Sequence, residues 1–228
     1  MIIAIDGPSG AGKSTLAKRL ARELGFTYMD TGALYRALAL KVLRQGVDLA
    51  DDARLAALLG STAIDLREER GKLVVLMDGQ DVAGDIRTPE VSQMASKVSA
   101  LKSVRARLLE LQRDLGKRGS VVAEGRDIGT VVFPAAEVKI FLDASVGERA
   151  RRRNQELCAD GRAAQLAETL REMEERDRRD SERDLAPLCQ AADAVRVDSS
   201  AVDAEQVAVI VLNLVNQRKA RKNYRDRS

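Results

Sequence analysis

The chain has 228 residues, enough for one well-buried core with a modest insertion. Its 38 basic and 35 acidic residues nearly balance to a net charge of +3, so the overall charge does not indicate a nucleic-acid or membrane-surface protein. Histidine is absent, which excludes histidine general bases, Ser-His-Asp triads and most zinc sites.

The first elements read as a strand-helix-strand unit. Residues 2–5 form an apolar run typical of a strand buried on both faces of a parallel sheet. After a glycine-rich stretch, leucines 16, 20 and 24 recur at helical spacing, and Gly25 ends that helix. A short strand is predicted at 26–29, and a helix from about 34 to 43 that Gly46 ends.

The middle of the chain changes character. Residues 64–67 alternate, residues 72–77 favour a strand, and Asp78-Gly79 is a hairpin-turn signal. We predict an inserted antiparallel patch over about 64–82, followed by helical patterns from Pro89 to about Lys117.

The remaining segments return to the parallel core. Residues 121–123 and 138–142 read as strands, and a charged helical segment covers 148–179. A last strand is predicted at 194–197, followed by an amphipathic helix from about 204 to 218. The predicted fold class is α/β, with a parallel β-sheet flanked by helices.

Three features bear on compartment and partners. Cys158 and Cys189 lack CxxC or zinc-ligand spacing, so we expect unpaired thiols that are buried or partly buried. No basic region precedes the first apolar strand, and no segment has the ~20 uninterrupted apolar residues of a membrane helix. We therefore expect a cytoplasmic protein without a membrane or nucleic-acid partner. The basic tail at 218–227 is interpreted as a solvated helix end, with a nucleic-acid arm as the alternative.

The glycine-rich stretch carries the first chemical motif. Gly7-Pro8-Ser9-Gly10-Ala11-Gly12-Lys13-Ser14 matches G-x-x-x-x-G-K-[ST], the phosphate loop of P-loop NTPases. Backbone N–H groups of such a loop point at phosphates, glycines permit its close turns, and the helix N-terminus adds positive potential. We predict that residues 7–15, ending at Thr15, bind ATP, with Lys13 on the β- and γ-phosphates and the Ser14 hydroxyl on Mg²⁺.

The sequence distinguishes between several classes of phosphate-loop protein. The N-K-x-D guanine motif of GTPases is absent. Residues 121–124 could be the apolar strand ending in a water-activating acid, Glu124, that remodelling ATPases carry, but the chain is short for that class. An ATP-dependent switch or assembly module stays open as an alternative, as does a kinase for another small acceptor.

Arginines favour the kinase. A lid would use them to cancel the repulsion between two phosphorylated substrates, although those at 149–153 could also be a charged helix face. An acceptor that is itself a phosphate needs no general base, which fits the absence of histidine. The arginines in question are Arg36, Arg126, Arg149, Arg152, Arg153, Arg176 and Arg183.

Along essentially its whole length the chain resembles the bacterial cytidylate kinases, which belong to the nucleoside monophosphate kinases. The most specific string is Gly-Arg-Asp-Ile-Gly-Thr-Val-Val-Phe-Pro at 125–134. The other segments that carry the resemblance are 5–14, 30–36, 79–82, 86–88, 139–144, 176–183 and 186–188. The resemblance implies a single kinase domain, with a core at 1–61 and 118–228, a monophosphate-binding insertion at about 62–117 and a helical lid at about 148–162.

The resemblance also implies roles for individual residues. The acceptor phosphate would be held by Arg36, Arg126 and Arg183, and the ribose by Arg176 and Asp180. The base would be read by Ser96, Arg105 and Asp127, with Thr31 and Tyr35 lining the same pocket. Arg149 and Arg153 would be the lid arginines, and Lys13, Arg126, Arg149 and Arg153 the catalytic residues. The implied substrates are ATP with Mg²⁺ and CMP or dCMP, and we expect a monomer.

Asp127 also has a rationale of its own. The exocyclic amine of cytosine donates a hydrogen bond that a carboxylate accepts, whereas uracil presents an acceptor at that position. Without the family string, a helix cap or an ion pair with Arg126 would be the simpler interpretation of Asp127. Glu124 stands where an Asp is also familiar, and its role, through water near Mg²⁺ or in support of Lys13, is left open.

Overall fold

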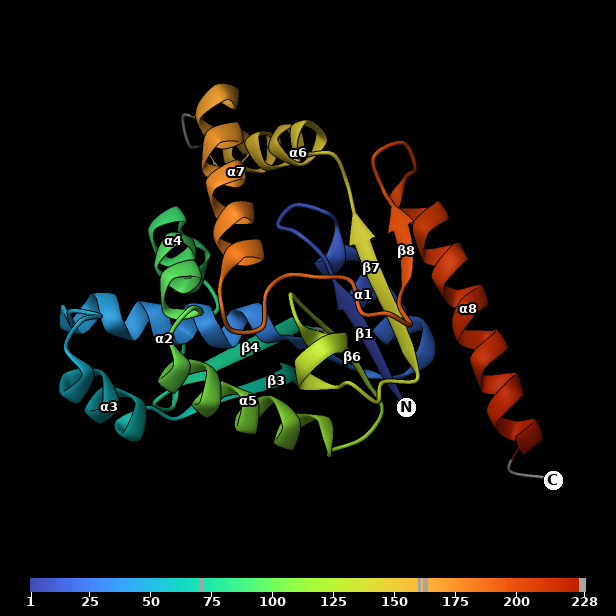
Figure 1. Ribbon diagram of the computed structural model, residues 1–228, viewed down its shortest axis with the longest axis horizontal. Coiled ribbons are helices and arrows are strands. Elements are labelled where there is room, and N and C mark those ends of the chain that lie inside the picture. Colours follow the sequence, from blue (N-terminus) through green and yellow to red (C-terminus); the bar gives the residue numbers. More distant parts are fainter. Residues whose placement is uncertain (70–71, 160, 162–163, 226–228) are drawn as a thin grey trace. The chain divides into compact units, whose positions relative to one another are not determined.

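The computed structural model describes residues 1–69, 72–159, 161 and 164–225 (Figure 1). The chain forms two compact units. Unit 1 comprises Met1–Tyr28, Gly119–Glu182 and Ala186–Ser228, and unit 2 comprises Met29–Arg118 and Arg183–Leu185.

A five-stranded sheet contains the first strand at its centre. The strands are β1 (Ile2–Asp6), β2 (Thr27–Asp30), β6 (Val121–Gly125), β7 (Val138–Asp143) and β8 (Val195–Asp198), in the order β2-β6-β1-β7-β8. β1 pairs in parallel with β6 and β7, and β7 with β8. Ile3 and Ile5 are fully buried because both faces of the central strand are covered. The predicted fold class is confirmed.

The helices of unit 1 are α1 (Lys13–Leu24), α6 (Val146–Ala159), α7 (Leu166–Glu182) and α8 (Ala204–Arg225), with a short π-helix η2 (Ile128–Val132) after β6. α1 packs on β6 and on α8, and α6 packs against α7. The charged segment predicted at 148–179 is therefore two helices. Gly161, whose φ of 75° lies in the left-handed region, sits in the break and cannot continue a right-handed helix at that angle.

Unit 2 contains helices and a small antiparallel sheet. Its elements are α2 (Thr31–Gln45), α3 (Asp52–Ser61), β3 (Ile64–Glu69), β4 (Lys72–Met77), β5 (Gln80–Asp81), a 3₁₀ turn η1 (Asp85–Arg87), α4 (Pro89–Val98) and α5 (Lys102–Gly116). α2 contacts α4, β3 and β4. The antiparallel patch is confirmed, and its hairpin turns at Asp78 and Gly79, both with positive φ.

Three predictions need correction or completion. α3 was not predicted, although Asp51 caps it by accepting the Arg54 N–H and Leu55 and Leu58 bury its apolar side. The cysteines are unpaired as expected, but both are exposed rather than buried. α8 reaches Arg225 instead of ending near Arg218, and residues 226–227 of the basic tail lie outside the described residues.

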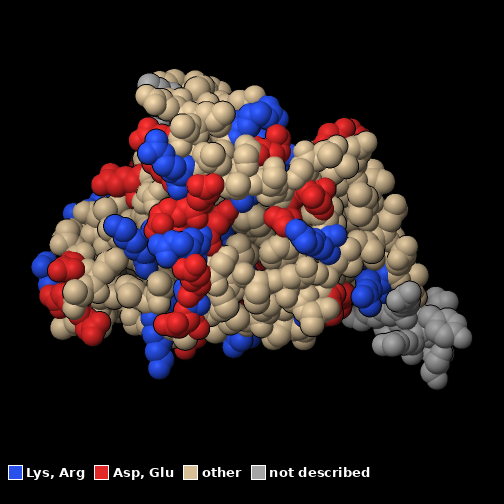
Figure 2. All heavy atoms as spheres, turned by 45° about the horizontal axis from the view of Figure 1, so that its top comes forward, with Lys and Arg blue, Asp and Glu red and all other residues tan. Residues whose placement is uncertain are grey.

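Charge and hydropathy add two observations. Basic and acidic side chains lie intermixed on the face shown in Figure 2. Among the described residues, no helix is long and apolar enough to span a membrane.

Candidate active site

The phosphate loop connects β1 to α1 and packs tightly against its neighbours. A Cβ on Gly7, whose φ is 149°, would lie 1.9 Å from the carbonyl oxygen of Leu142 on β7. A Cβ on Gly10 would approach Met173 Cε at 3.0 Å and Arg149 Cβ at 3.1 Å. These two positions therefore favour glycine, because the loop passes directly over the end of β7 at Leu142 and over the side chains of Met173 and Arg149.

Lys13 is buried at the start of α1. Its Nζ donates to the carbonyl oxygen of Pro8 at 2.6 Å, so the side chain curls back along the loop. Burial, and to a lesser extent the positive charge of Arg126, lower the pKa of Lys13 to about 7, while the negative charge of Glu124 opposes the shift. A buried lysine in contact with the loop backbone is adapted to a ligand that brings negative charge, because that charge would stabilise the ammonium form.

Asp6, the last residue of β1, is a buried carboxylate that sequence reasoning did not single out. Its Oδ1 accepts the Ile128 N–H and its Oδ2 accepts the Gly129 N–H, both at 2.7 Å. Burial raises the pKa of Asp6 to about 6, although these two backbone hydrogen bonds favour the ionised form. The carboxylate thereby anchors the turn that follows β6.

The turn after β6 carries two of the predicted site residues. Arg126 Nε donates to Asp180 Oδ2 of α7 at 2.8 Å. Burial disfavours the Arg126 charge, but the carboxylates of Asp180, Asp177 and Glu124 together outweigh it and raise the pKa of Arg126. Asp127 is buried immediately before η2, and no hydrogen bond from its side chain caps that helix, so the alternative role as a cap does not hold.

Glu124 is buried one residue before the end of β6. It accepts a short hydrogen bond from the Tyr28 hydroxyl. Lys18 of α1 lies over the Tyr28 ring, with its Nζ 5.7 Å from the ring centroid. Tyr28 had not been predicted as part of the site, and its contact holds the Glu124 carboxylate next to α1.

Arg149 and Arg153, the two predicted lid arginines, have different surroundings. Arg149 is buried, and it donates to the carbonyl oxygens of Ala144 at 2.8 Å and Ser9 at 3.1 Å. Its guanidinium also pairs with Asp177 at 2.6 Å. Arg153 is more exposed and pairs with Glu156 at 3.1 Å. Of these two arginines, Arg149 is the one that contacts the phosphate loop within the described part of the chain, and residues 160 and 162–163 of the predicted lid lie outside that part.

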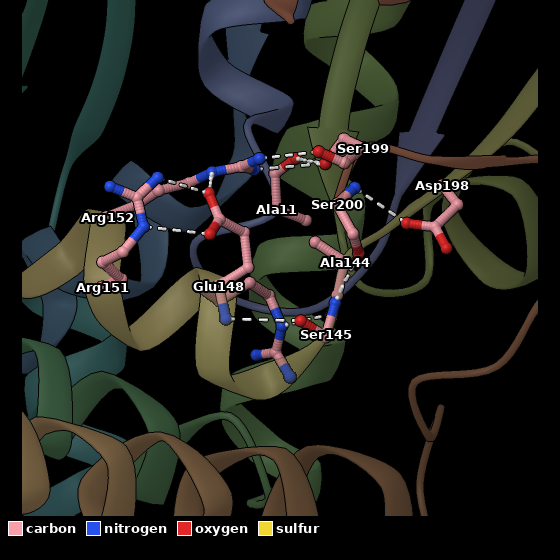
Figure 3. A network of polar contacts seen from close by, with 10 residues as sticks. Ala11, Ala144, Ser145, Glu148, Arg151, Arg152, Asp198, Ser199 and Ser200 are labelled. Atoms are coloured by element: carbon pink, nitrogen blue, oxygen red, sulfur yellow. Dashed lines mark hydrogen bonds and ion pairs between the residues drawn. The ribbon is translucent and has the colours of Figure 1, made fainter. Parts of the chain in front are cut away.

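A further network, drawn in Figure 3, connects α6 to the same loop. Ser199 Oγ, just after β8, donates to the carbonyl oxygen of Ala11 at 3.1 Å. Arg152 donates to Ser199 Oγ at 3.2 Å and to its carbonyl oxygen at 2.6 Å, and pairs with Glu148 at 2.9 Å. Arg151 pairs with the same Glu148 carboxylate and is exposed. Arg152 therefore holds the loop through Ser199.

Within unit 2 the predicted residues gather around α2 and α4. Arg36 Nη2 pairs with Asp30 Oδ2 at 2.7 Å, and the other carboxylate oxygen of Asp30 accepts the Ala33 N–H and so caps α2. Thr31, the first residue of α2, is buried. One acidic residue thus orients both the helix and its arginine.

Ser99, at the end of α4, connects three of the predicted residues in unit 2. Its hydroxyl donates to the Ser96 carbonyl oxygen at 2.8 Å and accepts from Arg183 Nη1 at 3.1 Å. Its own carbonyl oxygen accepts from Arg105 Nη1 at 3.3 Å. The Arg105 guanidinium also lies 5.9 Å from the centroid of the Tyr35 ring. We call Ser96, Ser99, Arg105 and Arg183 the Ser99 cluster; Ser99 had not been predicted.

The structure thus brings the predicted residues together in two groups. Unit 1 holds residues 7–15, Arg126, Asp127, Arg149, Arg153, Arg176 and Asp180, and unit 2 holds Thr31, Tyr35, Arg36, Ser96, Arg105 and Arg183. The residues that sequence reasoning missed are Asp6, Tyr28, Ser99, Arg152 as a loop contact and Ser199. Asp6 alone had a local signal, since it is a charged residue at the end of an otherwise apolar strand.

The family model and two of the relatives that match this chain carry the same description, cytidylate kinase. The family model described as cytidylate kinase matches residues 3–217. A cytidylate kinase from Pelotomaculum thermopropionicum is 52% identical over 215 residues, which cover 94% of this chain and 95% of the relative. A cytidylate kinase from Citrifermentans bemidjiense is 50% identical over 220 residues, 96% of this chain and 94% of the relative.

A solved structure supports the fold only. An uncharacterized protein from Eubacterium ventriosum superimposes with a TM-score of 0.50 at 13% identity, covering 95% of this chain and 98% of that one. At this identity the similarity concerns the arrangement of helices and strands and carries no information on the substrate.

Proposed function

The chain belongs to the cytidylate kinase family, and from that premise we propose that it transfers the γ-phosphoryl group of ATP to CMP and dCMP, producing ADP and the cytidine diphosphates. The observation that carries the donor half of this proposal is the phosphate loop with its buried Lys13. Glycine at positions 7 and 10 lets the loop pack closely on Leu142, Met173 and Arg149, and Lys13 gains a partner for its charge when phosphates bind.

Residues of this chain suit the metal that such a donor carries. The Ser14 side chain is exposed in the first turn of α1, where a hydroxyl can ligate Mg²⁺. Bound Mg²⁺ would neutralise charge on the β- and γ-phosphates. Lys13 holds the same phosphates, and Arg149, beside Ser9, stabilises the oxygens of the transferred group.

Arginines bind the acceptor nucleotide in this proposal. Arg36, Arg126 and Arg183 orient the acceptor phosphate, whose oxygen is already anionic near neutral pH and attacks without a general base. Arg176 and Asp180 bind the ribose hydroxyls. Asp180 also pairs with Arg126, so the same carboxylate positions that arginine.

The base is selected by polar side chains. Asp127 accepts from the cytosine amine, Arg105 donates to the ring acceptors, and Ser96 completes the set, with Thr31 and Tyr35 lining the pocket. Buried mismatched polar groups are unfavourable by about 1–3 kcal/mol, so uracil nucleotides are rejected. Arg153 is the second lid arginine. Closure of the lid region at about 148–162 excludes water, which would otherwise hydrolyse ATP.

ADP release measured with ATP-Mg²⁺ and a panel of acceptors tests the proposal. CMP and dCMP should support rapid turnover, UMP and AMP slow turnover, and a reaction without an acceptor almost none. Preference for another nucleotide would overturn the base assignment but keep the kinase. Turnover independent of any acceptor would instead identify an ATPase module. The cytoplasmic location and the monomeric state stay predictions from the sequence.

A further inference from the structure

We propose that Asp6 is a positioning residue for the acceptor nucleotide: its carboxylate sets the turn that presents Arg126 and Asp127. The inference rests on the proposed function, and it concerns a residue that does not itself touch the substrate. Asp6 lies next to the phosphate loop in sequence, so the simpler expectation would connect it with the donor nucleotide.

The geometry points to the turn instead. Both carboxylate oxygens of Asp6 accept a backbone N–H, one from Ile128 and one from Gly129, at 2.7 Å each. These amides directly follow Asp127 in the chain. Asp6 is 4% exposed, so water does not replace these hydrogen bonds when they are lost. A displacement of the two amides would therefore displace the Asp127 side chain.

The opposite side of the turn is also held. A Cβ placed on Gly129 would lie 3.1 Å from Lys139 Cδ and 3.3 Å from Asp6 Oδ2. Lys139 is itself fixed, because its Nζ donates to the Pro134 carbonyl oxygen at 2.6 Å and to Asp193 at 2.8 Å. Gly129 thus sits between the Asp6 carboxylate and the Lys139 stem, where a side chain would force one of these neighbours to shift.

The turn continues into η2, and η2 also helps to hold Asp127 in place. The Val131 and Val132 N–H groups both donate to the Asp127 carbonyl oxygen, at 2.9 and 3.1 Å. A π-helical turn of this kind is uncommon and is frequent at functional sites. The Asp127 backbone is therefore held from two sides. Its carbonyl oxygen accepts hydrogen bonds from η2, and the two amides that follow it in the chain donate to Asp6.

The test is the Asp6→Asn variant, in which the side chain keeps its size but its amide nitrogen faces one of the two N–H donors. We expect the KM for CMP to rise about tenfold, while the KM for ATP changes less than about twofold. The preference for CMP over UMP, as a ratio of kcat/KM, should fall as well. A merely structural role would lower the melting temperature without separating the two substrates.

Gly129→Ala provides an independent probe should Asp6→Asn fold poorly. It crowds the same turn from the other side and should reproduce the rise in KM for CMP. In the double variant the effects should combine to less than their product, because both act through one turn. Asp51→Asn is the matched control, since Asp51 also accepts a backbone N–H, from Arg54 at 3.0 Å, but caps α3.

The outcomes separate the two proposals. If the wild-type protein phosphorylates CMP and folded Asp6→Asn and Gly129→Ala keep its KM for CMP, the positioning role is wrong and the kinase stands. An equal rise in the KM for ATP would assign Asp6 to the phosphate loop. If the wild-type protein does not phosphorylate CMP, the proposed function fails; the amide NMR shifts of Ile128 and Gly129 in Asp6→Asn then still report whether the anchor exists.

Discussion

The phosphate loop and the Ser99 cluster handle charge in different ways. In the loop, one contiguous stretch supplies a buried ammonium group whose pKa burial lowers to about 7. In the Ser99 cluster, two arginines from distant parts of unit 2 converge on one serine through its hydroxyl and its carbonyl oxygen. The loop is therefore poised to gain stability from a phosphate ligand, whereas the cluster is already ordered by uncharged acceptors.

The largest loss of activity is expected from a substitution in the phosphate loop. Lys13→Met should reduce phosphoryl transfer by at least about 10²–10³-fold, because a preorganised cation aimed at developing charge is lost. The same change should raise the melting temperature of the ligand-free protein, because a charge disfavoured by burial is removed. Coupled-enzyme kinetics and differential scanning fluorimetry measure the two effects.

Lys18→Met is the matched control for Lys13→Met, since Lys18 is exposed one turn further along α1. It should leave turnover almost unchanged. Near-normal turnover of Lys13→Met would show that the phosphate loop takes no part in phosphoryl transfer. The phosphate loop and the Ser99 cluster would then not differ in the way described above.

The second-largest effect is expected on the choice between cytosine and uracil nucleotides. Asp127→Asn should lower the kcat/KM ratio of CMP to UMP by about 10–100-fold, because an amide can donate where a carboxylate only accepts. The KM for ATP should not change. Competition between CMP and UMP in one reaction measures the ratio directly, and a ratio equal to that of the wild-type protein would exclude Asp127 from base reading.

The lowered pKa of Lys13 predicts a dependence of ATP binding on pH. Bound phosphates favour the ammonium form, so binding takes up a proton wherever free Lys13 is neutral. The affinity is therefore full below about pH 7 and is lost as the pH rises through that value, by about fivefold between pH 7 and pH 8.

Isothermal titration calorimetry in buffers of different ionisation enthalpy counts the protons taken up. The same linkage affects folding: since the pKa of Lys13 is lower in the folded state than its usual 10.5, the stability of the ligand-free protein decreases as the pH falls from there towards 7. Lys13→Met should abolish both dependences. Proton uptake that persists in this variant would assign the titration to another group.

The smallest effect is expected in the Ser99 cluster. Ser99→Ala removes the hydroxyl that accepts from Arg183 but keeps the carbonyl oxygen that accepts from Arg105, so the KM for CMP should rise only about threefold to fivefold. Ser92→Ala is the control, since the Ser92 hydroxyl also donates to a helix carbonyl oxygen, that of Thr88. Equal KM values for the two variants would make Ser99 a structural residue only.

The sequence by itself determined the strand-loop-helix opening, the antiparallel patch and the phosphate loop, because each is a local pattern of apolar period, glycine position and turn residues. The family string pointed to Arg126 and Asp127, and it could not say what holds them. Only the tertiary structure decided that Asp6 meets two amides 122 and 123 residues away, and that Ser99 meets Arg183 84 residues away. It also decided that Arg152 reaches Ser199 while Arg151 stays on the surface. These neighbouring arginines look alike in sequence, and what separates them is which side of α6 packing buries, a choice that depends on elements far along the chain.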